Sequence, residues 1–148
     1  PGADLENKEI LDEIKKFIKS NRNAYFFKSL GQVNYFSFLS CVDGMIGNSS
    51  SGILEMPYFK KGTVNIGNRQ SGRICDKSVI NIAINKLEIQ KAIKKILSKS
   101  FLKKIKKSKN NLYGKPGATN KIIKILEKIK YQNIFQKTFF DITFKGKA

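Results

Sequence analysis

The chain has 148 residues, of which 41% are hydrophobic, and its formal net charge is +18. This length suits one domain that buries roughly two-thirds of its unfolded surface, and the hydrophobic content excludes wholesale disorder. No run of about 18 apolar residues exists to span a membrane, and we find no signal peptide. The two cysteines follow no metal or redox spacing. We therefore expect a cytoplasmic protein in which Cys41 is a small buried residue.

Elements alternate between helix and strand along the first part of the chain. Apolar residues recur at helical spacing over residues 5–18, which predicts an amphipathic helix. We expect a short aromatic strand at 24–27, a helix at 35–39, a strand at 42–46 and a helix at 51–59 in which Pro57 disturbs regular pairing.

The same alternation continues towards the C-terminus. Strands are predicted at 63–66 and 78–82, followed by an amphipathic helix at 86–98 with Leu87, Ala92, Ile93, Ile96 and Leu97 facing inwards. A further helix is predicted at 121–129, with Thr119 as its cap. Strands that alternate with helices imply βαβ units, so the expected fold class is α/β with a parallel sheet flanked by helices.

The positive charge raises the alternative of a basic module that binds nucleic acid. Only three of the 29 cationic residues are arginines, and the lysines are spread along the chain. The densest run, at 99–109, has Phe101, Leu102 and Ile105 at helical spacing. This pattern favours a solvated helix face with an apolar underside.

The most informative segment is 42–57, VDGMIGNSSSGILEMP. An apolar run stops at Gly47, passes through three serines and a second glycine, and continues as an amphipathic segment. Such a strand, turn and helix N-terminus predicts an anion site, because the first helical N–H groups are unpaired and the helix dipole is positive there.

A second glycine-rich loop, 67–72, lies within 65–73, NIGNRQSGR. Arg69 and Arg73 stand in it, and a guanidinium donates to phosphate or carboxylate in a planar, bidentate way. Either arginine could instead pin the loop to a neighbouring carboxylate. Because this loop and the loop at 47–52 both follow predicted strands, we expect them at one edge of the sheet, where such folds bind ligands.

The string GNSSSGILEMPYFKKGTVNIGNRQSGR at 47–73 closely resembles the C-terminal half of hydrolysing UDP-N-acetylglucosamine 2-epimerases. The flanking segments 28–32, together with Tyr35, and 77–80, 111–115 and 139–141 are also similar to that family. The resemblance implies a Rossmann-like domain, the second of two that face each other across a cleft in the GT-B arrangement, over residues 1–148. The first strand of that domain is expected to precede Pro1.

The resemblance also assigns residues that hold UDP. Ser49 and Ser50 match serines that bind the phosphates, and Glu55 matches a glutamate that accepts hydrogen bonds from ribose hydroxyls. From the residues alone, Glu55 could equally complement the helix dipole. Arg69 matches an arginine that contacts the nucleotide, and Leu30 corresponds to a backbone contact near the uracil.

Two further residues are additional candidates for the UDP site. Tyr35 could pack against the base, although ordinary core packing is the alternative for an aromatic residue at helical spacing. Arg73 is the second arginine of the loop at 67–72.

The resemblance implies a reaction in which UDP leaves with loss of the C2 proton and water then adds with inversion at C2. Such steps need positioned acids and bases, which the family takes from its N-terminal domain. This chain has no histidine, and we expect no catalytic residue in it, no cofactor and no activity of the chain alone.

The implied partners are a UDP-sugar, the N-terminal domain of the same enzyme and further copies in a homo-oligomer, with no membrane and no specific nucleic acid. Two alternatives to the epimerase remain open, the donor-nucleotide domain of a GT-B glycosyltransferase and the basic nucleic-acid-binding module.

Overall fold

The computed structural model describes residues 7–108, 112–114 and 116–129. The chain divides into two compact units, Pro1–Leu112 and Tyr113–Ala148. The first unit contains a three-stranded sheet with helices on both faces, and the second contains one described helix. Of the segments that resemble the family, 139–141 lies outside the described residues, as do residues 111 and 115 of the segment 111–115.

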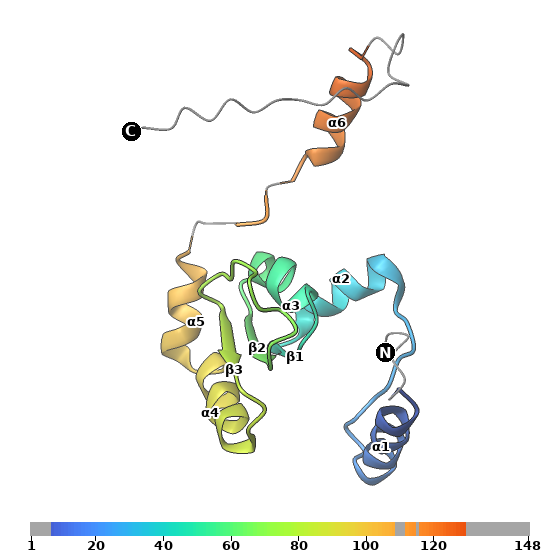
Figure 1. Ribbon diagram of the computed structural model, residues 1–148, viewed down its shortest axis with the longest axis vertical. Helices are drawn as coiled ribbons and strands as arrows, with labels where there is room; N and C mark the ends of the chain where they lie inside the picture. Colours follow the sequence, from blue (N-terminus) through green and yellow to red (C-terminus); the bar gives the residue numbers. More distant parts are fainter. Residues whose placement is uncertain (1–6, 109–111, 115, 130–148) are drawn as a thin grey trace, which may run out of the picture. The chain divides into compact units, whose positions relative to one another are not determined.

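The sheet consists of β1 (Gly44–Gly47), β2 (Gly62–Ile66) and β3 (Val79–Ile82), in the order β1-β2-β3. Both pairs are parallel, with Gly47 opposite Asn65 and Ile66 opposite Ile82. The parallel α/β arrangement predicted from the alternating pattern is therefore confirmed. The carboxyl ends of β1 and β2 meet at one edge, from which the two glycine-rich loops emerge (Figure 1).

Helices α4 (Lys86–Ile96) and α5 (Lys99–Lys106) cover one face of the sheet. The main apolar core lies there and comprises Val64, Ala92, Ile96, Phe101 and Ile105. The side chain of Asn85 caps α4 by accepting hydrogen bonds from two backbone N–H groups, and the hydroxyl of Ser98 caps α5 by accepting one, from the Phe101 N–H. The lysines of α5 remain exposed, as predicted for the basic run at 99–109; Lys109 itself lies outside the described residues.

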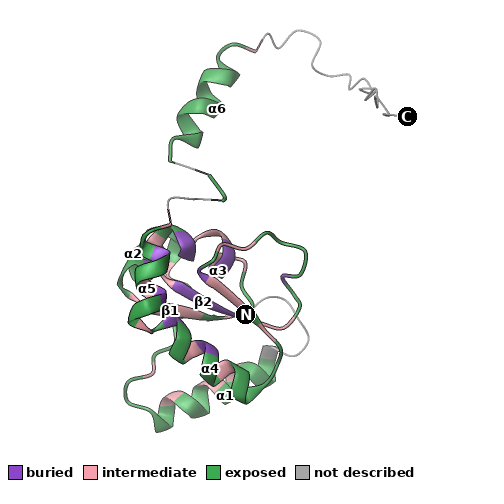
Figure 2. Ribbon diagram, turned by 90° about the vertical axis from the view of Figure 1, so that its left-hand side faces the viewer, coloured by how far each residue is buried: buried purple, intermediate pink, exposed green. Residues whose placement is uncertain are grey.

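The opposite face carries α2 (Gly31–Cys41), the one-turn helix α3 (Ser51–Leu54) and the 3-10 helix η1 (Met56–Phe59). Successive residues of β2 point to opposite faces: Val64 joins the core beneath α4, whereas the Thr63 hydroxyl donates to the carbonyl of Gly52, 2.8 Å away. Figure 2 shows that the buried residues concentrate at β2 and the helix segments beside it.

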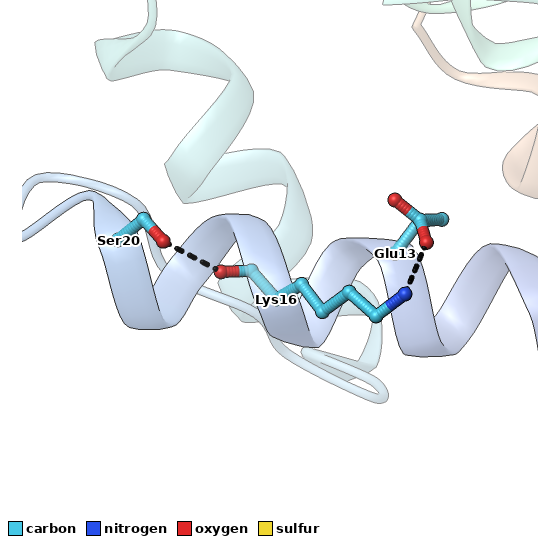
Figure 3. A network of polar contacts seen from close by, with 3 residues as sticks. All are labelled: Glu13, Lys16 and Ser20. Carbon is cyan, nitrogen blue, oxygen red and sulfur yellow. Dashed lines mark hydrogen bonds and ion pairs between the residues drawn. The ribbon is translucent and has the colours of Figure 1, made fainter.

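Helix α1 (Asn7–Ser20) confirms the amphipathic helix predicted at 5–18, within the described residues. Its polar face carries a short network (Figure 3): Lys16 donates to Glu13 at 2.7 Å, and Ser20 Oγ donates to the Lys16 carbonyl at 3.3 Å. The hydrogen bond to Glu13, and then its negative charge, raise the pKa of the fully exposed Lys16 ammonium above its usual value.

Helix α6 (Ala118–Leu126), in the second unit, buries none of its residues. It overlaps the helix predicted at 121–129, but Thr119 is wrong as its cap. Gly117 occupies the N-cap position with a φ of 99°, and Thr119 lies inside the first turn. Among the described residues no helix is both long enough and apolar enough to cross a membrane.

Two predicted elements differ in kind from the observed structure. The strand at 24–27 is wrong: this segment is irregular, and Tyr25 remains 77% exposed because it pairs with none of the three strands of the sheet. The helix predicted at 51–59 is divided into α3 and η1, and the expected disturbance of regular pairing at Pro57 is confirmed. Pro57 has no N–H for a helical bond, and the chain tightens from α3 into η1, with the Tyr58 N–H donating to the Glu55 carbonyl.

Smaller differences concern strand and helix ends. The strand predicted at 42–46 begins at Gly44 instead. Leu87 and Leu97 are 65% and 47% exposed, because they lie in the first turn of α4 and just past its end, outside the stretch that faces the sheet. The prediction that Cys41 is buried is wrong. Cys41 is exposed at the last position of α2, and the buried residue of this helix is Leu39.

Candidate functional site

The loops after β1 and β2 are joined at the carboxyl edge of the sheet. The carbonyl of Asn48 accepts a hydrogen bond from Arg69 Nη1 at 3.2 Å and another from Gln70 Nε2 at 2.8 Å. Gln70 is only 7% exposed, whereas Arg69 is exposed. The structure thus brings together the turn at 47–52, the serine turn, and the loop at 67–72, the arginine loop, as the parallel-sheet prediction requires.

The turn at Ser49 and Ser50 differs from a row of unpaired helical donors. The N–H of Ser51 donates to Ser49 Oγ at 3.3 Å, and the N–H groups of Ile53 and Leu54 donate to the Ser50 carbonyl at 2.9 Å each. Although α3 is only four residues long, the N–H groups of residues 51–55 are thus already paired within the turn and the helix. The donors that this turn offers to an anion include the hydroxyls of Ser49, which is exposed, and of Ser50, which is half-buried.

A second polar group links α2 to the end of α3. Ser51 Oγ donates to Glu55 Oε2 and also makes a hydrogen bond with the hydroxyl of Tyr35. All three residues are half-buried. The sequence predicted Tyr35 as a base contact or as a core residue, and neither alternative predicted this hydrogen bond. Through Ser51, it connects the Tyr35 hydroxyl to Glu55, the predicted ribose-binding carboxylate.

An open groove of about 700 Å³ lies between the irregular segment at 25–30 and the start of α2. Leu30 and Tyr35, the two residues expected near the uracil, both line it, together with Tyr25, Phe27 and Phe38. The lining is mainly aromatic and apolar, which is the kind of surface on which a flat base packs.

Arg73, the remaining candidate, is exposed. Its backbone N–H donates to the Gln70 carbonyl at 3.3 Å, and its guanidinium has no ion pair or hydrogen bond within the described part of the chain. Among the described residues no group of three or more histidine, cysteine or carboxylate side chains could hold a metal ion.

Three residues of the site were missed by sequence reasoning: Asn48, Gln70 and, as a partner of Glu55, Ser51. Gln70 stands beside Arg69 in the loop, but nothing in the sequence indicates that it is buried. Beneath the loops, Asn65 Nδ2 donates to Asn81 Oδ1 at 2.8 Å. Asn65 Oδ1 and Gln70 Oε1 are buried without a hydrogen-bond partner among the described residues, so this edge retains acceptors that the fold itself does not use.

The fold and its polar edge define a Rossmann-like α/β domain with a candidate nucleotide site. A family model described as UDP-N-acetylglucosamine 2-epimerase matches residues 1–127. The chain belongs to this family, as the resemblance at 47–73 predicted.

Individual relatives agree with this assignment. The chain is 39% identical over 140 residues to GDP/UDP-N,N'-diacetylbacillosamine 2-epimerase (hydrolyzing) of Campylobacter jejuni, a match that covers 93% of this chain and 36% of the relative. It is 33% identical over 141 residues to polysialic acid biosynthesis protein P7 of Escherichia coli, covering 95% of this chain and 36% of that protein. The chain thus spans about a third of the length of the curated relatives that it matches.

Proposed function

We propose that this chain is the nucleotide-binding domain of a hydrolysing 2-epimerase that converts UDP-N-acetylglucosamine and water into N-acetylmannosamine and UDP. The observation that carries the proposal is the joining of the serine turn to the arginine loop through the Asn48 carbonyl. This contact places hydroxyl donors and a guanidinium at the strand-end edge, where open α/β sheets bind nucleotides.

In this proposal Ser49, Ser50 and Arg69 hold the diphosphate. Arg69 uses one nitrogen on Asn48, and a guanidinium has five N–H donors, so further donors remain for phosphate oxygens. Arg73, exposed and without an ion pair among the described residues, adds positive charge near the same loop. Stabilising the departing diphosphate is one of the tasks that the reaction requires.

The base and ribose parts of UDP occupy the neighbouring features. The aromatic groove lined by Leu30 and Tyr35 receives the uracil. Glu55 accepts a hydrogen bond from a ribose hydroxyl through the carboxylate oxygen that Ser51 does not occupy. Two links connect these features: Tyr35, which lines the groove, is joined to Glu55 through Ser51, and Asn48 of the serine turn is joined to the arginine loop.

Proton transfer at C2 is assigned to groups outside this chain. The chain has no histidine, and we propose that an N-terminal domain of the same cytoplasmic, homo-oligomeric enzyme supplies the acid and base. The chain alone then binds UDP but does not release it from a UDP-sugar. Because a relative is named for N,N'-diacetylbacillosamine, UDP-linked diacetylbacillosamine is the competing substrate to assay beside UDP-N-acetylglucosamine in a protein that carries both domains.

Isothermal titration calorimetry of the purified chain with UDP tests the proposal. We expect saturable binding that added duplex DNA does not displace, and an affinity about tenfold lower in Arg69→Ala, as for the loss of a charge-assisted hydrogen bond. Arg22→Ala is the matched control, because it removes the same charge from an exposed turn after α1. Equal losses in both variants, or DNA competing with UDP, would favour a basic surface that binds phosphates without a built site.

A further inference from the structure

We infer that Tyr35 and Ser51 are positioning residues that set the preference of this site for a ribonucleotide over a deoxyribonucleotide. The inference rests on the proposed function, because it takes Glu55 as the acceptor for a ribose hydroxyl. Ser51 acts on the ligand only through Glu55. Tyr35 acts through Ser51 and Glu55 and also lines the base groove.

The direction of the hydrogen bonds follows from the number of protons. A serine hydroxyl has a single proton, and Ser51 gives it to the acceptor-only carboxylate of Glu55. In the other bond Ser51 Oγ must therefore accept, and the Tyr35 hydroxyl donates to it. The result is a one-way relay from Tyr35 through Ser51 to Glu55 Oε2.

This relay fixes the ribose acceptor before any ligand arrives. Glu55 follows the last residue of α3 and is half-buried, and a free glutamate side chain would lose rotamer freedom on binding. With Oε2 held by Ser51, the second carboxylate oxygen, Oε1, has a defined direction in which to accept from a ligand hydroxyl. Removal of the relay leaves the acceptor present but no longer oriented.

The far end of the relay is itself held in place. Tyr35 belongs to α2, and the neighbouring Phe36 lies 6.3 Å, centroid to centroid, from Phe59 of η1. Contacts of this kind keep α2 against η1 when the Tyr35 hydroxyl is removed. The ring of Tyr35 meanwhile lines the base groove, so one side chain contacts the proposed base site and orients the proposed ribose site.

The test compares the affinities of the full chain for UDP, 2′-deoxy-UDP and 3′-deoxy-UDP by calorimetry. In the unmodified chain we expect at least one deoxy analogue to bind about tenfold more weakly than UDP, as for one hydrogen bond to a carboxylate. In Tyr35→Phe and Ser51→Ala that ratio falls to about threefold or less, while the affinity for the deoxy analogue stays within about twofold.

Matched controls separate orientation from a general loss of structure. Tyr58→Phe removes a tyrosine hydroxyl from η1, and Ser37→Ala removes a hydroxyl of α2 that donates to the Val33 carbonyl; both should keep the unmodified ratio. Ser51→Thr retains a hydroxyl at the relay position and should therefore keep the preference for UDP over the deoxy analogue. Glu55→Gln should lower it, because the acceptor itself changes.

Each outcome decides between the two proposals. If the chain binds UDP with a clear preference that Tyr35→Phe and Ser51→Ala leave intact, the relay does not position Glu55 and the inference is overturned, while the proposed function stands. Equal affinity for UDP and both deoxy analogues in the unmodified chain also overturns the inference. Failure to bind UDP at all overturns the proposed function and the inference with it.

Discussion

Gly52→Ala should destabilise the chain and disturb the site, because Gly52 lets α3 lie directly on β2. A Cβ added at this position would stand 2.6 Å from Thr63 Cγ2 and 3.3 Å from the Met45 sulfur. The Gly52 carbonyl also accepts the buried hydrogen bond from the Thr63 hydroxyl. The added methyl group must push α3 away from the sheet, and α3 carries Ser51 and leads into Glu55.

The expected cost follows from three contributions. Overpacking a core contact costs about 1–3 kcal/mol, and weakening the Thr63–Gly52 hydrogen bond costs about 1 kcal/mol. The higher helix propensity of alanine offsets about 1 kcal/mol of this. We therefore expect Gly52→Ala to lower the free energy of unfolding by about 1–3 kcal/mol.

Thr63→Ser supplies the matched rescue. It removes Cγ2, the atom in the closest contact, but keeps Oγ1, which lies 3.5 Å from the added Cβ and makes the hydrogen bond. Thr63→Ser alone should cost about 1 kcal/mol for one buried methyl group. The double variant should be no less stable than Thr63→Ser, so that the two substitutions are strongly non-additive.

Urea unfolding followed by far-ultraviolet circular dichroism measures all four proteins, and UDP titration of the folded variants reports on the site. A Gly52→Ala chain as stable as the unmodified one would show that α3 does not need its close approach to β2. Simple additivity of the two changes would show that Thr63 Cγ2 is not the obstacle.

Three further predictions concern single polar side chains. Gln70→Ala removes a buried donor from the Asn48 carbonyl, and should lower the free energy of unfolding by about 1–2 kcal/mol and weaken UDP binding; an unchanged UDP affinity would contradict its role in holding the two loops together. Asn85→Ala removes the cap of α4 and should cost about 1 kcal/mol in urea unfolding, whereas Asn85→Asp should retain most of that stability. Ser78 Oγ is buried without a partner among the described residues, so Ser78→Ala should leave the urea midpoint unchanged or raise it, and a clear decrease would reveal a bond to this hydroxyl.

Much of the secondary structure could be predicted because its signals are local. Helix α4 has an asparagine cap and apolar residues at helical spacing, and β2 is a short segment with the β-branched residues Thr63, Val64 and Ile66. The segment at 24–27 shows where such reasoning fails. Aromatic residues favour strands only when a neighbouring strand is there to pair with, and nothing in the tetrapeptide reports the absence of that neighbour.

The candidate site was predictable in part for the same reason. Glycines and serines after an apolar run mark a strand-end turn wherever they occur, and the likeness at 47–73 assigned roles to the residues in it. The hydrogen bond of Gln70 to Asn48 joins residues 22 positions apart, and the hydrogen bond of Tyr35 to Ser51 joins residues 16 positions apart. Such pairings depend on how the elements pack, which no local pattern contains.

The sequence by itself determined the family, the α/β class and the two loops that meet at the sheet edge, because short-range periodicity and turn chemistry decide where strands and helices begin and end. Only the tertiary structure decided how these parts act on one another. The close approach of Gly52 to Thr63 sets the height of α3 above the sheet, and with it the place of Glu55. The same packing brings α2 beside α3, so that the Tyr35 hydroxyl reaches Ser51 and the serine turn is held from both sides.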